Sequence, residues 1–255
     1  MRTSFAALAS SLALSALAPA TTIAHWNFND LNDSSVNGHN LTNTNGSDTT
    51  INGGIATFSG GGTGLLSAPD NAAWDDISFT IESVFTFTPP STAGAISTIA
   101  AHLSNTTGRQ WLFGVNPNSI PYLLVREQGA NDEQSFASSF GALTEGHTYY
   151  FGAAIDLTAS DPANRVTLYF KDITNSGALI TNNFSTSITA LQGSSAPLSI
   201  GSTGHSSSRF KGSIDEVRFS DTKLGAGDLL VVPEPSSALL SFFTVSLLGL
   251  RRKRA

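Results

Sequence analysis

Adjacent acidic residues are the side chains of this sequence best suited to acid–base chemistry. Hydrolysis of a glycosidic bond needs two carboxyl groups about 5 to 9.5 Å apart across a cleft, and positions i and i+2 of one strand can supply them. The acidic pairs here are adjacent instead, at Asp75-Asp76, Asp132-Glu133 and Asp215-Glu216. The last pair should face opposite sides of a strand, the second falls in a polar loop, and the first is predicted to cap a turn. The sequence therefore predicts no catalytic carboxylate array and no enzyme.

Nucleophiles and metal-binding histidines are equally sparse. The chain has no Gly-x-Ser-x-Gly elbow, which would also need helices to position it. The histidines are scattered without zinc-ligand spacing and are predicted to be loop or strand-end residues: His25, His39, His102, His147 and His205. The glycines at 60, 61, 62 and 64 are followed by neither Lys-Ser/Thr nor a helix, so this segment is predicted to be a bend and not a phosphate cradle.

Aromatic side chains could bind sugars, because their faces stack on pyranose CH groups. The candidates are Trp74, Trp111, Tyr122 and Tyr149. Trp111, like Trp26, lies inside an apolar strand and is predicted to be a core residue. Trp74 is flanked by Asn71 and Asp75 in a polar connection. The sequence therefore predicts that Trp74 is exposed and is the candidate carbohydrate-binding residue.

The elements that must position these residues are predicted to be strands. Short apolar runs, several of them alternating, are separated by Gly, Ser, Thr and Asn, and a short turn at 224–230 is the only helical signal. Strands are predicted at 55–58, 79–87, 111–115, 122–125, 149–157, 166–170, 198–200 and 214–219. The pattern predicts one all-β domain, a two-sheet antiparallel jelly-roll sandwich flanked by an N-terminal signal peptide and a short C-terminal hydrophobic helix.

The N-terminus has the order of a secretory signal peptide. Met1-Arg2 forms a positive n-region, residues 5–17 form an apolar h-region, and Ala18 and Ala20 provide small residues at a cleavage site. Residues 1–20 are therefore predicted to direct export. Cleavage after Ala24 is an alternative, so the mature protein begins at Thr21 or at His25.

The last 24 residues, 232–255, combine three features. Pro233-Glu234-Pro235 is an extended, kinked motif, residues 238–250 form an apolar run, and the chain ends in Arg251, Arg252, Lys253, Arg254 and Ala255. As a helix the run covers about 20 Å, less than a hydrocarbon core of about 30 Å. The cations should stay on the cytoplasmic side, with the body of the chain on the other face.

This order resembles the PEP-CTERM sorting signal of Gram-negative bacteria. The resemblance implies transient anchoring in the inner membrane, recognition of the tail by an exosortase, and removal of the tail from the exported protein. An ordinary C-terminal membrane anchor is the alternative, although the apolar run is short for a full span.

The body between these two segments is acidic and has no cysteine. The chain has 13 basic and 19 acidic residues, and the two terminal segments hold five of the basic and one of the acidic residues, which leaves 8 and 18 and a net charge of about −10. Such a surface argues against nucleic acid and anionic lipid as partners. Stability must come from a large core or from metal, because no disulfide can form.

Residues 21–231 resemble the LamG-like jelly rolls of the concanavalin A-like lectin and glucanase group. The resemblance rests on an aromatic opening strand at 26–30, a loop at 33–38, middle strands at 55–58, 79–82 and 166–170, and above all the closing strand Phe210 to Phe219. Val36 replaces a glycine of the family's loop. The laminarinase branch of the group carries acids at alternate positions of one strand, and this chain has no such array.

The resemblance also implies a structural calcium ion that links the first strand to the last. Its ligands here would be Asn29 or Asp30, together with Asp215. Alternatively, Asp215 accepts hydrogen bonds from loop amides or pairs with Arg218 across a turn. We expect an exported cell-surface or secreted non-catalytic protein that binds carbohydrate or contributes to an extracellular polysaccharide matrix; a glycan-degrading hydrolase of the same fold is the alternative.

Overall fold

The computed structural model describes residues 20–61, 64–92, 94–103, 109–129, 133–205 and 207–231. Residues 1–19 of the predicted signal peptide, with Ala18, and the predicted sorting signal at 232–255 lie outside these residues. Within the described ranges, no helix is long and apolar enough to span a bilayer.

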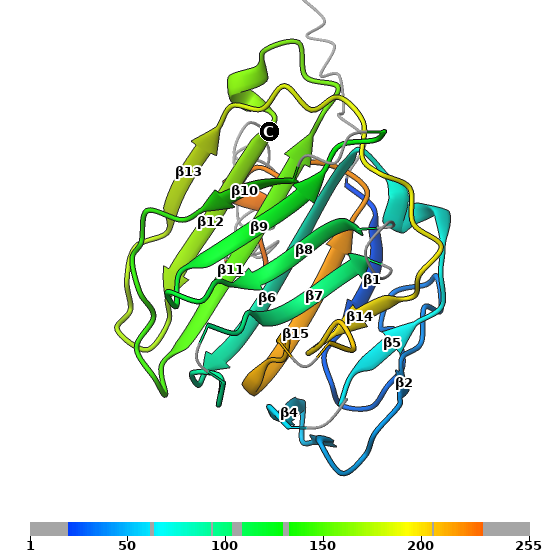
Figure 1. Cartoon of the computed structure of the whole chain (residues 1–255), viewed down its shortest axis with the longest axis vertical. Helices are drawn as coiled ribbons and strands as arrows, with labels where there is room; N and C mark the ends of the chain where they lie inside the picture. The colour runs from blue at the N-terminus through cyan, green and yellow to red at the C-terminus, as the bar shows by residue number, and fades with distance from the viewer. Residues whose placement is uncertain are drawn as a thin grey trace, which may run out of the picture.

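Two antiparallel sheets form a sandwich (Figure 1). The first sheet contains, in spatial order, β13 (Ile180–Phe184), β12 (Val166–Asp172), β11 (Thr148–Asp156), β6 (Ser78–Phe87), β15 (Lys211–Ser220), β4 (Ile55–Ser59) and β3 (Thr49–Asn52), with β1 (Thr22–Trp26) also paired to β15. The second contains β10 (Glu133–Ala137), β9 (Pro121–Arg126), β8 (Arg109–Val115), β7 (Ser97–Leu103), β14 (Leu198–Ile200), β5 (Leu66–Ala68) and β2 (Thr42–Asn43). The predicted all-β, two-sheet fold is confirmed.

Three short 3₁₀ turns connect strands in the described part of the chain. They are η1 (Ala72–Asp75), η2 (Pro162–Asn164) and η3 (Ala226–Asp228). The last confirms the turn predicted at 224–230. The opening strand was predicted at 26–30, but β1 ends at Trp26, and Phe28 has a φ of 50° that takes the chain out of extended conformation.

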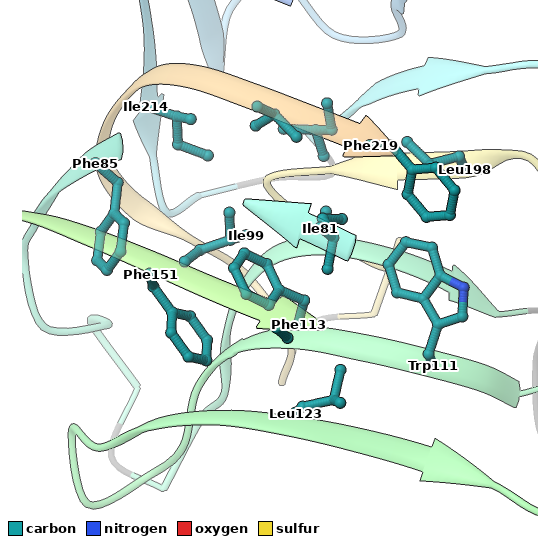
Figure 2. Close-up of a cluster of buried hydrophobic side chains, with 14 of the residues drawn as sticks. Ile81, Phe85, Ile99, Trp111, Phe113, Leu123, Phe151, Leu198, Ile214 and Phe219 are labelled. Atoms are coloured by element: carbon teal, nitrogen blue, oxygen red, sulfur yellow. The ribbon is translucent and has the colours of Figure 1, made fainter. Parts of the chain in front are cut away.

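The core lies between the sheets because alternate strand residues point inward. In β6 the inward positions hold Phe79, Ile81, Phe85 and Phe87, all fully buried. Across the sandwich, Phe151 of β11 and Phe113 of β8 stack with ring centroids 4.4 Å apart (Figure 2). Aromatic pairs of this kind add about 0.5–1.5 kcal/mol to the free energy gained by burial.

β15 joins the parts of the first sheet. One edge bonds β6, while the other bonds β4 over its first half and β1 over its second half. A bulge interrupts the register between Ile214 and Glu216. Because Ile214 and Val217 both point into the core, Asp215 and Glu216 both lie away from it. The prediction that these two acids face opposite sides of the strand is therefore wrong.

The residues after β15 cross the outer face of the first sheet. We call residues 222–231 the strap. Leu224 and Leu229 of the strap are buried against Tyr150 and Tyr169, which project outward from β11 and β12. The strap therefore covers the part of the outer face formed by β11 and β12.

Candidate functional site

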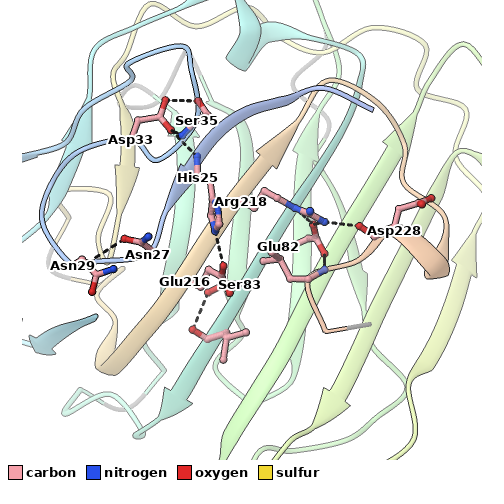
Figure 3. A network of polar contacts seen from close by, with 12 residues as sticks. His25, Asn27, Asn29, Asp33, Ser35, Glu82, Ser83, Glu216, Arg218 and Asp228 are labelled. Atoms are coloured by element: carbon pink, nitrogen blue, oxygen red, sulfur yellow. Dashed lines mark hydrogen bonds and ion pairs between the residues drawn. The ribbon is translucent and has the colours of Figure 1, made fainter. Parts of the chain in front are cut away.

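A buried ion pair lies at the centre of the outer face of the first sheet (Figure 3). Glu82 of β6 is fully buried and is the cross-strand neighbour of Arg218 of β15. Arg218 donates through Nε and Nη2 to Oε2 of Glu82, at 2.8 and 2.5 Å. The other oxygen, Oε1, accepts from the Tyr150 hydroxyl at 2.6 Å and the Leu230 N–H at 3.0 Å. Four donors thus occupy the roughly four lone-pair positions of a carboxylate, so Glu82 has no capacity left to act as a catalytic base.

Two tyrosines next to this carboxylate are kept protonated. Burial, followed by the charge of Glu82, raises the pKa of Tyr150 well above its usual value. Burial and the charges of Glu82 and Asp228 raise the pKa of Tyr169. Tyr169 donates its hydroxyl to the Leu224 carbonyl at 3.1 Å. Both hydroxyls therefore act as permanent donors, one to Glu82 and one to the strap.

The accessible polar pair of this face is His25 of β1 with Glu216 of β15. His25 Nε2 lies 2.5 Å from Glu216 Oε1, and the side chains are 27% and 29% exposed. Asn27 and Asn29 follow on the same segment (Figure 3). An exposed imidazole, carboxylate and amides can donate to and accept from hydroxyl groups. The neighbouring Glu82 is buried and saturated, so it cannot be the second carboxylate that glycosidic hydrolysis requires.

Asp33 organises the loop after β1. It accepts from the backbone N–H of His25 at 2.9 Å, of Ser35 at 2.8 Å and of His39 at 2.9 Å, and from the Ser35 hydroxyl at 2.7 Å. Burial acts to raise the pKa of Asp33, but these hydrogen bonds favour the carboxylate more strongly, so the pKa is lowered. The role of Asp33 is to hold the loop against β1.

The residues predicted to bind calcium lie on neighbouring segments. Pairing of Trp26 with Val217 directs the chain after β1 toward the bulge at Asp215, and Asn29 lies beside Gly54 in the β3–β4 turn. Asp30 is occupied by its own turn, accepting from the backbone and side-chain nitrogens of Asn32 at 2.8 and 2.7 Å.

The donor set for calcium is only partly present. Burial, then the charge of Glu216, raises the pKa of Asp215, as expected for a carboxylate beside a like charge. Among the described residues, no group of three acidic or histidine side chains could hold a metal ion, whereas calcium takes about six to eight oxygens. The calcium site stays a prediction that would rest on amide and backbone oxygens. The side chain of Arg218 is held by its ion pair with Glu82, and not by the alternative ion pair with Asp215.

Trp74 is not exposed, contrary to the prediction. Asn71 caps η1 by accepting from the Ala73 N–H at 2.9 Å, and the turn places the Trp74 ring in the core with no exposed surface. Its Nε1 donates to the Pro69 carbonyl at 3.1 Å, and its ring packs edge-on against Phe219 at 5.2 Å. Trp74 therefore closes one end of the sandwich and cannot stack on a sugar.

The other aromatic candidates are also buried: Trp111, Tyr122 and Tyr149. Trp26 and Trp111 are fully buried, which confirms the prediction that they are core residues. Among the described Phe, Tyr and Trp residues, Phe140 and Phe184 are partly exposed and the others are buried. Any sugar recognition by the described part of the chain must therefore rely on polar groups more than on stacking against aromatic rings.

His102 is buried near the end of β7, the central strand of the second sheet. Its Nδ1 lies 2.5 Å from Gln110 Oε1 and its Nε2 lies 2.8 Å from the Ala196 carbonyl. Asp70 and Asp75 approach opposite ring nitrogens, at 3.3 and 3.7 Å. Because these contacts diverge around the ring, they tie loops to the sheet and do not converge on a metal ion.

Sequence reasoning missed the two polar pairs on the first sheet. His25 and Glu216 are 191 residues apart, and Glu82 and Arg218 are 136 apart. A local signal existed only for Glu82, a charged residue at an outward position inside the apolar run of β6. Such a residue needs a partner when the face is covered, but strand periodicity does not identify that partner.

No known protein family and no curated protein sequence matches this chain. Solved structures do match its fold. Domain 4 of AbnA, a GH43 extracellular arabinanase from Geobacillus stearothermophilus, in complex with arabinotriose, matches at 17% identity and a TM-score of 0.51, covering 82% of this chain and 96% of that one.

Binding domains of a botulinum neurotoxin also share the fold. The DC binding domain in complex with SialylT matches at 13% identity and a TM-score of 0.57 over 82% of this chain. The same domain in complex with rat synaptotagmin II matches at 15% and 0.59 over 81%. This chain spans about half the length of those two. At such low identity, the matches establish the jelly-roll fold alone.

Proposed function

We propose that this protein is an exported, non-catalytic domain that binds carbohydrate, as part of or in contact with an extracellular polysaccharide matrix. The observation that carries the proposal is the fold, which spans nearly all of an arabinanase domain that was solved with a bound arabinotriose. The saturation of Glu82 supports a non-catalytic role, because it removes this buried carboxylate as a candidate catalytic acid.

The proposed recognition surface is the His25–Glu216 pair with Asn27 and Asn29. This surface presents donors and acceptors side by side, as needed to bind vicinal hydroxyls; His25 and Glu216 lie on paired strands of the first sheet, and Asn27 and Asn29 lie in the segment after β1. Hydrogen bonds to charged groups contribute about 1.5–3 kcal/mol each, so loss of one should weaken binding at least about 10-fold.

Incubation of the exported protein with a panel of insoluble polysaccharides tests this function. We expect retention on at least one polysaccharide with no new reducing ends. Release of reducing ends would establish the alternative, a glycan-degrading hydrolase. If the protein is neither retained nor releases reducing ends, the polysaccharides of the panel are excluded as its ligands.

Matched variants test the location of the surface. Glu216→Gln should weaken retention, whereas Glu145→Gln, at an exposed position in the loop before β11, should leave it unchanged. Equal retention of both variants would show that sugars bind elsewhere.

We propose further that export ends with exosortase removal of the tail that carries Pro233, Glu234 and Pro235. The support is the sequence order of motif, apolar run and basic cluster. Glu234→Ala should leave the tail uncut and the protein in the inner membrane, as measured by fractionation and intact mass. Normal release of this variant would contradict processing by an exosortase and would favour another route to the surface.

A further inference from the structure

The segment just before β1 meets the residue just after β15. The Thr21 N–H donates to Oδ1 of Asp221 at 2.9 Å, and the Asp221 N–H donates back to the Thr21 carbonyl at 3.1 Å. Thr22 then pairs with Ser220 as β1 begins. Asp221 directly follows β15 and precedes the strap, so this two-bond contact fastens the start of β1 to the start of the strap.

We infer that the mature protein begins at Thr21 and that its new α-ammonium group forms an ion pair with Asp221. This inference rests on the proposed export. Hydrolysis of the Ala20–Thr21 peptide bond adds one water molecule, leaving a carboxylate on Ala20 and an amine on Thr21. An unperturbed α-amino group has a pKa of about 7.7–8.0, so the amine is mostly charged at neutral pH. A single neutral N–H donor facing a carboxylate is thereby replaced by a cation.

The alternative cut after Ala24 would remove residues that belong to the fold. Ala24 is fully buried and pairs with Phe219. The carbonyls of Thr22 and Ile23 accept from Asn37 Nδ2 at 3.1 and 2.9 Å. The Ser35 hydroxyl, which donates to Asp33, also lies 3.1 Å from the Ile23 carbonyl. Loss of residues 21–24 would remove the two carbonyl acceptors of Asn37 Nδ2, shorten β1 and expose an edge of β15.

A nearby carboxylate does not by itself distinguish the two cuts. The His25 N–H also faces a carboxylate, that of Asp33, at 2.9 Å. The difference is that Asp33 already accepts from three other donors of its loop, including Ser35 and His39, whereas Asp221 receives the Thr21 N–H at the exposed edge. The buried Ala24 and the loop contacts therefore decide in favour of Thr21.

The first arm of the test is the intact mass and N-terminal sequence of the protein recovered outside the inner membrane of a Gram-negative host that expresses the full chain. We expect Thr21 as the first residue. A first residue of His25 would overturn this inference while leaving export intact. Retention of Met1 in all of the protein would overturn export, and this inference with it.

The second arm tests the ion pair in the exported protein. Asp221→Asn keeps a side-chain oxygen but removes the charge, and we expect an aminopeptidase to trim its N-terminus about two- to five-fold faster than that of the unaltered protein, the range that an exposed ion pair can supply. Glu145→Gln is the matched control and should be trimmed at the unaltered rate. Equal trimming of all three proteins would overturn the ion pair.

Acetylation of the α-amino group separates the ion pair from a merely structural role of Asp221. With a free terminus, Asp221→Asn should lower the thermal unfolding midpoint by about 1–3 °C. With an acetylated terminus, Asp221→Asn should have a smaller effect, because the ammonium is gone and the remaining Thr21 N–H can donate to the Asn oxygen. An undiminished effect in the acetylated protein would show that Asp221 acts through other contacts and would overturn the inference.

Discussion

At the scale of single residues, Asp33 and Glu82 show two uses of a buried carboxylate. Asp33 is satisfied almost entirely by the loop in which it lies, whereas Glu82 is satisfied by three separate elements: β11, β15 and the strap. The first arrangement is local and independent of the rest of the sheet. The second exists only when the whole outer face has assembled.

Replacement of Asp33 by Asn should destabilise the protein at neutral pH by about 1–3 kcal/mol, because an amide NH₂ would face a backbone donor. The lowered pKa of Asp33 means that its carboxylate stabilises the fold above the unfolded pKa of about 3.9 and loses that contribution as pH falls through the folded value. The difference between unaltered protein and variant, measured by urea unfolding, should therefore shrink between pH 7 and pH 2. A difference that is constant over this range would contradict the assigned role.

The loop around Asp33 could be recognised from the sequence, but the network around Glu82 could not. Residues 33–38 carry the order of small and amide residues that a tight loop needs, and the Asp33 contacts lie within eight residues of it in sequence. The partners of Glu82 are 68, 136 and 148 residues away. Periodicity gives the side of the sheet on which a side chain lies, and it carries no information on which strand lies beside it.

At the scale of elements, the turn η1 places Trp74 in the core although its neighbours in sequence are polar. Asn71 and Asp75 flank Trp74 in sequence, and the cap by Asn71 makes the chain turn so that the ring points inward. The polar neighbours of Trp74 led to the prediction that it is exposed, but they indicate the position of a turn and not the exposure of the ring. β7 was missed for a related reason: it is buried on both faces, so its residues do not alternate.

Trp74→Ala should lower the free energy of unfolding by about 3–5 kcal/mol, because it leaves a large cavity among Trp26, Phe219 and His39. Denaturant unfolding measures this loss, and Trp74→Phe should lose less. Carbohydrate retention by the folded fraction should be unchanged. If Trp74→Ala lost retention on carbohydrate without losing stability, Trp74 would be a carbohydrate-binding residue after all.

At the scale of the whole molecule, the two-sheet architecture follows from sequence pattern, while the pairing of the strands does not. Most longer strands lie within a few residues of their predicted positions, for example β6, β11 and β15. The neighbours of β15 all lie between residues 22 and 87, far from β15 in sequence. Those pairings depend on how the outer and inner faces pack in three dimensions, which single-strand patterns do not encode.

The predicted calcium ion is best tested on the whole protein. A site formed by Asn29 or Asp30 with Asp215 would bind the folded chain preferentially, so excess chelator should lower the thermal unfolding midpoint, and added calcium should restore it. Asp215→Asn should abolish the response to chelator. An unchanged midpoint in chelator would exclude a stabilising calcium ion.

The place of β1 beside β15 has a consequence for the time course of folding. His25 meets Glu216 only after 191 further residues have been made, which takes about 10–40 s at ordinary rates of synthesis. Throughout that interval β1 has no neighbour in its sheet, and the first sheet cannot close. Nascent chains of this protein therefore stay open until their last strand emerges, a state that suits threading through a narrow channel but also exposes an unpaired edge to other chains.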